Sequence, residues 1–409
     1  MVAKLRVGLL GEFPDERQIK RNPWNLHYRL LLAAKQEGAT TVVFASNRAQ
    51  GRFAELCDRW VQWKPMVPGS QIFPATLPEA IRKESVDILV FNLSATYFLL
   101  AHRLASCAPN LVGLVTTPIY SRREITRAGI LRLLADPAGS RVHIATPFLI
   151  SRLTVSHLDR RKLILVTVSA RNAERLMALG YPRERIRVVQ PPFNLSFDDA
   201  GTRVPSLDGA ATAAEDKNNQ PSFVFLYLGS PTPLRGAFDV VRAFGQVAAD
   251  YPNARLVLLS RPDLPSFVKL SHKLVRLAER QGCVSRVRVV TDYLSAQEVR
   301  HHVLECGVVV LPFRLIPSDS PISVLEAMAE GKAVISTTLD GVPELLTEGR
   351  GLLVEPGDLR GLVSAMRSLI GDRGLRYRVG QAAKALVIDE YSGSAHEDGL
   401  RSLIRSLRG

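Results

Sequence analysis

Residues 308–336 read VVVLPFRLIPSDSPISVLEAMAEGKAVIS, and this stretch decides the fold class. Its two ends are short, apolar and rich in β-branched residues, so they predict two buried strands. Between them Ser320 is expected to be the N-cap of a helix, Pro321 its first residue and Gly331 its C-terminal stop. A strand, a helix and a second buried strand form the repeating unit of a parallel sheet that helices cover on both faces.

The same alternation runs through the whole chain in two series. The apolar runs of the first series are residues 5–10, 41–44, 87–91, 111–115 and 163–168, and those of the second are 223–228, 255–259, 287–290, 308–311 and 333–336. Residues between 198 and 221 are polar and lack periodicity, which is typical of a linker. The chain is therefore predicted to be an α/β protein with two doubly wound parallel-sheet domains, whose ligands bind at the carboxyl ends of the strands, in a cleft between the halves.

Length and composition exclude several classes of protein. The chain has 409 residues, of which 46% are hydrophobic and 22% charged, as in ordinary globular proteins and not in disordered or collagen-like chains. Its four cysteines form no CxxC pair, so no disulfide framework or zinc ribbon is predicted and a reducing cytoplasm is expected. Neither a signal peptide nor a membrane span is expected from the sequence. A net charge of +14 indicates an anionic partner: nucleic acid, a membrane surface or a phosphorylated substrate.

The loop after the run 223–228 has the layout of a phosphate site. Gly229-Ser230-Pro231-Thr232-Pro233-Leu234-Arg235-Gly236 joins a strand to an amphipathic helix. Free backbone amides and the helix dipole converge at such a helix start, and Arg235 can add a bidentate contact to phosphate oxygens. The segment lacks the standard dinucleotide and P-loop fingerprints. The alternative, an ordinary connecting loop with a solvated arginine, therefore stays open for this segment.

The helix that follows the run 308–311 adds a carboxylate. Ile322, Ser323 and Glu326 share one face at i+3 and i+4 spacing, close to unpaired amides at the helix start. A carboxylate there can accept hydrogen bonds from a diol while the amides hold a diphosphate. The alternative is that Glu326 only pairs with a lysine, which is the commoner fate of a glutamate on a helix.

Three segments together resemble the nucleotide-sugar-dependent glycosyltransferases of family 4 (group 1). They are residues 226–236, residues 321–335, and residues 341–346 with 351–358. The resemblance implies a GT-B fold with two Rossmann-like domains that face a cleft, retention of anomeric configuration, and no metal or other cofactor. We expect an N-terminal acceptor domain over residues 1–197, a linker over 198–221, a nucleotide-sugar-binding domain over 222–390, and a C-terminal helix over 391–409 that returns to the N-terminal domain.

Residue roles follow by position in the family pattern. Arg235 matches the basic residue that binds the donor diphosphate, and Glu326 matches the second glutamate of an E-x7-E motif, which holds the ribose hydroxyls. The first glutamate falls on Ser318, with Asp319 next to it, and an arginine that often follows the loop glycine is replaced by Ser230. The resemblance implies catalytic roles for Arg235, Glu326 and Asp319, donor contacts by Gly229, Ser230, Arg261, Ser318, Pro321, Ile322 and Ser323, and an acceptor-side position for Thr117. Thr117 stands where many members carry a histidine, and Arg261 or Arg314 would replace a missing phosphate contact.

Much of the positive charge is concentrated in residues 121–162. Nine Lys and Arg against three Asp and Glu give this segment a net charge of +6, and apolar residues are interleaved with them. Two interpretations stay open: a merely solvated basic face, or peripheral attachment to an anionic bilayer at the inner face of the membrane, with a lipid-linked acceptor. No recognised motif supports nucleic-acid binding.

The resemblance predicts a glycosyltransferase that moves a sugar from a nucleotide-diphosphate sugar to a glycan, a lipid or a small molecule. A second hypothesis is a noncatalytic glycosyltransferase-like subunit that binds an active partner, which the departures at Ser230, Ser318 and Thr117 motivate. A third, a nucleotide-sugar epimerase on the same fold, fits the C-terminal motifs less well.

Overall fold

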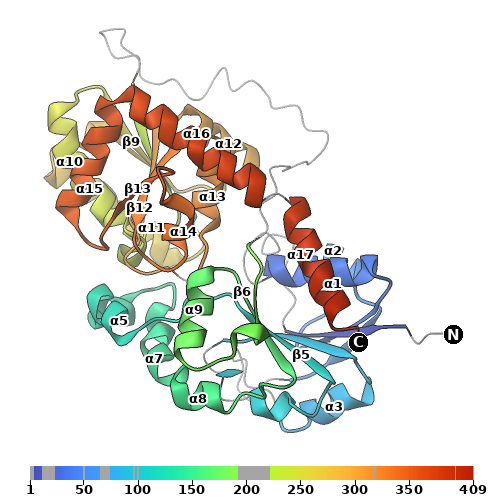
Figure 1. The fold of residues 1–409 in the computed structure, drawn as a ribbon. Coiled ribbons are helices and arrows are strands. Elements are labelled where there is room, and N and C mark those ends of the chain that lie inside the picture. Colours follow the sequence, from blue (N-terminus) through green and yellow to red (C-terminus); the bar gives the residue numbers. More distant parts are fainter. Residues whose placement is uncertain are drawn as a thin grey trace.

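A computed structural model of the protein describes residues 4–11, 24–48, 51–64, 74–94, 97–98, 101–191, 222–316, 319–391 and 393–408. It contains two parallel sheets, each covered by helices on both faces (Figure 1). The α/β class and the pair of doubly wound domains predicted from the sequence are thereby confirmed. The expected linker, residues 198–221, lies outside the described residues.

The N-terminal sheet has seven strands in the order β3-β2-β1-β4-β5-β6-β7. Every pairing in it is parallel. The strands are β1 (Arg6–Gly11), β2 (Thr40–Ala45), β3 (Arg59–Gln62), β4 (Ile88–Asn92), β5 (Asn110–Val115), β6 (Leu163–Thr167) and β7 (Ile186–Val188). The helices are α1 (Trp24–Gln36), α2 (Gly51–Glu55), α3 (Leu77–Lys83), α5 (Arg122–Ala128), α6 (Ile130–Ala135), α7 (Thr146–Leu149), α8 (Arg152–Ser156) and α9 (Ala170–Ala178), with 3-10 turns η1 (Ala101–Leu104), η2 (Ser140–Ala145) and η3 (Arg183–Arg185).

The C-terminal sheet has six strands in the order β10-β9-β8-β11-β12-β13, again all parallel. The strands are β8 (Phe223–Leu228), β9 (Ala254–Leu259), β10 (Val287–Val290), β11 (Val308–Leu311), β12 (Ala333–Thr337) and β13 (Leu352–Val354). The helices are α10 (Ala237–Asp250), α11 (Pro265–Arg280), α12 (Ala296–Glu305), α13 (Ile322–Ala329), α14 (Val342–Leu346), α15 (Leu359–Gly371) and α16 (Arg373–Glu390), with 3-10 turns η4 (Pro233–Arg235) and η5 (Val284–Arg286).

Both sheets are buried on their two faces, which explains why their strands are continuously apolar. In β4, Leu89 and Phe91 pack into one hydrophobic cluster, whereas Ile88 and Val90 pack into another on the opposite face. Successive side chains of a strand point to opposite faces, so a strand covered on both sides carries apolar residues at every position. In both sheets the strand order reverses beside the first strand of the domain, at β1 and at β8, and ligands of such sheets bind at this point.

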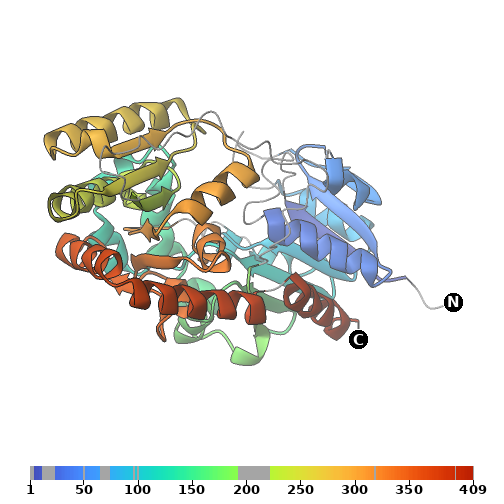
Figure 2. The ribbon, with the colours of Figure 1, turned by 90° about the horizontal axis from the view of Figure 1, so that it is seen from above.

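The last helix of the chain, α17 (Gly393–Ser406), packs against α1 of the N-terminal domain. Figures 1 and 2 show the two helices side by side. Leu400 and Ile404 of α17 are buried in the same cluster as Leu26 and Leu30 of α1. Ion pairs join Arg29 to Glu397 and Arg405 to Glu37 at 3.2 and 2.7 Å. The end of the chain therefore ties the second domain back to the first.

Among the described residues, no helix has both the length and the apolar composition that crossing a bilayer requires.

Candidate functional site

Tyr227 holds the loop after β8 in place. Its hydroxyl lies within hydrogen-bond distance of the carbonyl oxygens of Ser230 (2.7 Å) and Arg235 (3.3 Å). Gly229 and Gly236 have φ angles of 145° and 82°, which residues with a side chain rarely adopt. The loop therefore turns sharply at both ends and places Arg235 directly before helix α10.

We expect Gly236→Ala to destabilise this loop and to weaken binding of a nucleoside diphosphate. A Cβ atom on Gly236 would lie 2.1 Å from the carbonyl oxygen of Pro312, so the backbone would have to move. The left-handed conformation adds about 1–2 kcal/mol for any L-residue. Thermal unfolding and calorimetric titration measure both effects.

Gly282→Ala is the matched control for that substitution. Gly282 also has a positive φ, of 66°, but a Cβ there meets nothing within 4 Å. Equal loss of stability in the two variants would mean that backbone conformation alone matters, and that the contact with Pro312 does not shape the loop.

The guanidinium of Arg235 has no hydrogen-bond or ion-pair partner among the residues that the structure describes. It lies over the ring of Phe313, with 5.4 Å between the guanidinium carbon and the ring centroid. Burial lowers the pKa of Arg235, while the nearby Tyr227 and Tyr120 raise it. Since buried charges in proteins are normally paired, an unpaired guanidinium in this place is available to an anionic ligand.

Helix α13 presents a polar face toward the same region. Its N-cap is Pro321, whose extended backbone (φ −71°, ψ 120°) starts the helix at Ile322, one residue later than the sequence predicted. Ile322, Ser323 and Glu326 are half-buried, whereas the other residues of the helix are buried. The predicted shared face is thus present, and the first-turn amides of the helix lie at one end of it. Ser318, a predicted donor contact, lies outside the described residues.

Glu326, like Arg235, has no hydrogen-bond partner among the described residues. Burial raises the pKa of Glu326 to about 7, and the positive charge of Arg261 opposes that rise. The same Arg261 charge lowers the pKa of Arg235. Arg235 follows β8, Arg261 follows β9 and α13 with Glu326 follows β11, and these three strands are neighbours in the sheet. The three charged residues therefore lie at the same edge, the carboxyl ends of the strands.

Arg314, the other arginine considered for a phosphate contact, is used elsewhere. Its guanidinium donates two hydrogen bonds to the carboxylate of Asp239 on α10, at 2.5 and 3.0 Å. Of the two arginines that would replace the missing phosphate contact, only Arg261, which is exposed, is free for this task.

Asp319 faces the N-terminal domain. Its carboxylate accepts a hydrogen bond from the Ser169 hydroxyl, and its backbone N–H donates to the carbonyl oxygen of Thr116 at 3.3 Å. The residue is 0% exposed. Burial raises the pKa of Asp319 to about 7; the Ser169 hydrogen bond opposes this shift and the charge of Glu344 adds to it. Asp319 is therefore part of the interface between the two domains.

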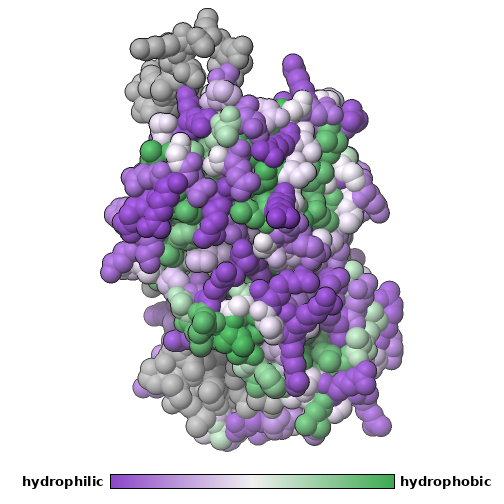
Figure 3. All heavy atoms as spheres, turned by 90° about the vertical axis from the view of Figure 1, so that its left-hand side faces the viewer, coloured by the Kyte–Doolittle hydropathy of each residue, from purple (hydrophilic) through white to green (hydrophobic). Residues whose placement is uncertain are grey.

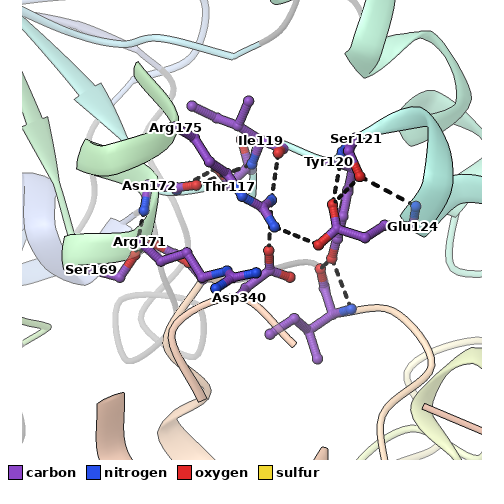
Figure 4. Close-up of polar contacts among 12 residues, drawn as sticks. Thr117, Ile119, Tyr120, Ser121, Glu124, Ser169, Arg171, Asn172, Arg175 and Asp340 are labelled. Atoms are coloured by element: carbon purple, nitrogen blue, oxygen red, sulfur yellow. Dashed lines mark hydrogen bonds and ion pairs between the residues drawn. The ribbon is translucent and has the colours of Figure 1, made fainter. Parts of the chain in front are cut away.

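Arg175 on α9 is the centre of that interface (Figure 4). Its guanidinium donates to the carboxylates of Asp340 (3.0 Å) and Glu124 and to the carbonyl oxygen of Ile119. Burial raises the pKa of Asp340 to about 8, which Arg175 opposes, while the charges of Asp319 and Glu124 raise it further. One guanidinium thus holds carboxylates from both domains.

Glu344 of the C-terminal domain completes the contact by capping α9. Its two carboxylate oxygens accept the backbone N–H groups of Ala170 (2.9 Å) and Arg171 (2.7 Å). A carboxylate is favourable at a helix N-terminus because of the unpaired amides and the helix dipole. In the sequence analysis, Glu344 appears only within the motif of residues 341–346. Its capping role was not predicted, and neither were the roles of Arg175 and Asp340.

The N-terminal side of the region is formed by residues that follow β5. The Tyr120 hydroxyl donates to the carbonyl oxygen of Ile316 and accepts from its N–H at 2.9 Å, across the domain interface. Thr117, the predicted acceptor-side residue, is half-buried, and its carbonyl oxygen accepts from Asn172 at 3.1 Å. The charge of Asp136, which lies on the N-terminal domain at the end of α6, raises the pKa of Arg235.

Comparison with known proteins identifies the second domain. Residues 222–372 match the family model described as glycosyl transferases group 1. The Rhizobium meliloti lipopolysaccharide core biosynthesis glycosyltransferase LpsE is 29% identical over 243 residues, which are 57% of this chain and 62% of that protein. The alpha-maltose-1-phosphate synthase of Mycolicibacterium smegmatis is 30% identical over 184 residues, 42% of this chain and 45% of that protein. The matches span less than two thirds of these relatives' length.

Solved structures share the fold of the whole chain. Anabaena HepE in complex with UDP superposes with a TM-score of 0.67 at 16% identity, covering 99% of this chain and 100% of that one. The glycosyltransferase WaaG, involved in lipopolysaccharide biosynthesis, gives a TM-score of 0.63 at 15% identity and covers 96% of this chain and 98% of its own. The GT-B architecture and the resemblance to group 1 glycosyltransferases, both predicted from the sequence, are confirmed.

Proposed function

We propose that this chain, which carries a group 1 glycosyltransferase domain in residues 222–372, transfers a sugar from a nucleotide-diphosphate sugar to an acceptor. The observation that carries the proposal is that two charged side chains at the same edge of the second sheet have no hydrogen-bond or ion-pair partner within the part of the chain that the structure describes. Arg235 and Glu326 lack protein partners among the described residues, and both lie within electrostatic reach of Arg261. Half-buried charges without partners are typical of ligand sites and not of structural ion pairs.

In this proposal the donor lies across the start of α13. The backbone amides of Ile322 and Ser323 hold the diphosphate, because the first amides of a helix have no partner within it. Arg235 adds a charged contact to the same phosphates, with Gly229 and Ser230 allowing close approach of the loop. Glu326 accepts hydrogen bonds from the two ribose hydroxyls. Bound UDP in the fold relative HepE agrees with a nucleotide ligand in this architecture.

We propose that the reaction retains the anomeric configuration and needs no metal ion. The bond between the anomeric carbon and the diphosphate oxygen breaks, and the acceptor oxygen bonds to the same carbon. A phosphate oxygen of the leaving group takes the acceptor's proton, so no side-chain base is required. Arg235 and the α13 amides stabilise the negative charge that develops on the diphosphate, which is the largest contribution that such a preorganised site can make.

Asp319 receives a different role from the other two catalytic candidates. Because its carboxylate is buried against Ser169, we assign it as a positioning residue that keeps the donor domain closed on the acceptor domain. Domain closure brings acceptor and donor together and excludes water. Thr117 lies on the acceptor side of this contact.

The experiment is calorimetric titration of the purified protein with a panel of nucleoside diphosphates and nucleotide sugars. Binding by one base, weakened about ten- to a hundredfold in Glu326→Ala with an unchanged melting temperature, supports the proposal, since a hydrogen bond to a charged group is worth about 1.5–3 kcal/mol. Binding by none of them would contradict it and favour the noncatalytic subunit.

Donor binding is expected to depend on pH through Glu326. Burial raises the pKa of Glu326 to about 7. Below that value the carboxyl is protonated and loses acceptor capacity, so affinity for a nucleotide sugar should fall about tenfold between pH 8 and pH 6. A nucleotide sugar is the proper ligand because its diphosphate does not titrate in this range.

Glu326→Gln is the matched control, since an amide keeps the shape but does not titrate. Its affinity should be lower than that of the wild type at pH 8 and independent of pH. A wild-type affinity that is flat from pH 8 to pH 6 would contradict the assignment of Glu326 to the ribose.

A further inference from the structure

Exposed apolar side chains gather on one face of the N-terminal domain. Of the thirteen large apolar side chains exposed among the described residues, six lie between residues 130 and 153. They are Ile130, Leu131 and Leu134 on α6, Val142 on η2, Phe148 on α7 and Leu153 on α8. Leu131 is 81% exposed and Leu153 69%. We call this set the apolar ridge.

Three of the four short elements that carry the apolar ridge, α6, η2 and α7, form a packed series. Helix α6 contacts both α5 and η2, and η2 contacts α7. Figure 3 views the side of the molecule that carries these helices and shows hydrophobic atoms gathered beside hydrophilic ones in its lower half, which is the N-terminal domain. An apolar set of this kind marks an interaction surface, because single exposed apolar residues are common but gathered ones are not.

The charge around the ridge is almost purely positive at the surface. All nine Lys and Arg of residues 121–162 are exposed, whereas none of the three acids is. Glu124 is bound to Arg175, Asp136 accepts from Ser140, and Asp159 accepts the N–H groups of Arg161 and Lys162. The internal hydrogen bonds of the acids thus leave the basic residues to face outward.

Basic and apolar groups alternate closely on this face. The Arg122 guanidinium lies 4.8 Å from the centroid of the Phe148 ring. Arg127 differs from the other basic residues, because its guanidinium forms an ion pair with Glu355 of the C-terminal domain at 2.7 Å. Apolar side chains beside guanidinium groups match the boundary between acyl chains and anionic headgroups of a bilayer.

Helix α6 connects this face to the candidate donor site. Its Leu133 is turned inward and packs with Leu234, the neighbour of Arg235, and with Leu315. Leu131 and Leu134 of the same helix are turned outward. Asp136 at the end of α6 acts electrostatically on Arg235. One short helix therefore has the exposed ridge on one side and the donor loop on the other.

We propose that the apolar ridge and its surrounding basic residues bind the surface of an anionic lipid bilayer, and that the acceptor is carried by a lipid of that bilayer. The second part rests on the proposed function; the first does not. In this proposal α6 lies between the bilayer surface and the loop that carries Arg235, so a lipid-linked acceptor meets the donor without leaving the bilayer. Positive charge attracts the protein to the bilayer and the ridge inserts at the headgroup boundary.

The test is co-sedimentation of the full chain with vesicles of phosphatidylcholine alone and of phosphatidylcholine mixed with phosphatidylglycerol. We expect at least tenfold stronger partitioning onto the anionic vesicles. The triple variant Leu131→Ser, Leu134→Ser, Phe148→Ser should lose at least tenfold of that binding. A control triple variant, Val268→Ser, Tyr377→Ser, Ile388→Ser, removes three exposed apolar side chains from the other domain and should bind as the wild type does.

Three results would overturn the proposal: equal binding to both kinds of vesicle, equal loss in both triple variants, or binding of duplex DNA in preference to the anionic vesicles. All substituted residues are exposed, so the melting temperatures should be unchanged. Calorimetric titration with the nucleotide found for the wild type separates the two proposals. If the wild type binds nucleotide but does not prefer anionic vesicles, only the membrane proposal fails. If it binds anionic vesicles but no nucleotide, only the proposed function fails.

Discussion

Replacing Arg235 with alanine is expected to lower kcat for sugar transfer by about 10²–10³-fold, the effect of removing one preorganised donor from a developing negative charge. In the structure this guanidinium has no protein partner among the described residues and is fixed over Phe313. Its loss therefore breaks no hydrogen bond or ion pair of the guanidinium with a described residue, and the fold should be unaffected. Steady-state kinetics and thermal unfolding of the same preparation measure the two quantities.

Two further variants sharpen this experiment. Arg235→Lys keeps the charge but not the planar, bidentate donor, so it should recover only part of the rate. Arg280→Ala, at the exposed end of α11, removes an arginine far from the loop and should leave kcat unchanged. An Arg235→Ala enzyme with a wild-type kcat would contradict a role for this residue at the leaving group.

At pH 9, where Asp340 is ionised, replacing Arg175 with alanine is expected to destabilise the protein by about 3–5 kcal/mol, the cost of removing one partner from a buried ion pair. Asp340 is 1% exposed and Arg175 is its ion-pair partner in the structure, at 3.0 Å. Without the guanidinium, Asp340 and Glu124 would face each other across the domain interface. We expect the thermal transition to shift down and catalysis to fall with it, because the domains no longer close in register.

The pKa of Asp340 determines how the stability of the folded protein changes with pH. Its pKa is raised from 3.8 to about 8 in the folded protein, first of all by burial. Between these values the folded state holds a proton that the unfolded state has lost, so this group makes stability fall as pH rises from about 4 to about 8. The loss in Arg175→Ala should therefore be larger at pH 9, where the carboxyl is charged, than at pH 6.

Asp340→Asn supplies the test of that explanation. The amide oxygen keeps a hydrogen-bond acceptor for Arg175 but does not ionise, so the melting temperature of this variant should vary less with pH than that of the wild type. Arg183→Ala, at an exposed position of η3, is the control for loss of an arginine. An Arg175→Ala protein as stable as Arg183→Ala at both pH values would show that the interface does not depend on this guanidinium.

Much of the fold could be predicted because the central strands of both sheets are buried on two faces. Continuous apolar runs such as Val308–Leu311 leave little choice of structure. The strands β3, β7 and β13 lie at or next to the sheet edges and were not predicted as strands, because they are short and partly exposed. Arg59 and Gln62 of β3, for example, are exposed and interrupt any apolar pattern.

The position of Arg235 and Glu326 at one edge of the second sheet could also be predicted from the sequence. Arg235 and Glu326 each follow a strand of the second sheet, and the doubly wound order brings the carboxyl ends of those strands together. The interface between the domains was not readable, because contacts such as Arg175 to Asp340 join residues 165 positions apart in sequence and carry no local pattern. On a helix, Arg175 is indistinguishable from a solvated arginine until the second domain is placed against it.

The central claim is that Arg235, Glu326 and the start of α13 form one site for a nucleotide-diphosphate sugar. A crystal structure of the protein with the nucleoside diphosphate selected by titration tests it most directly. The account predicts the diphosphate against the Arg235 guanidinium and the amides of Ile322 and Ser323, with the ribose hydroxyls on Glu326. A nucleotide bound elsewhere, or one that contacts Arg235 but not Glu326, would contradict it.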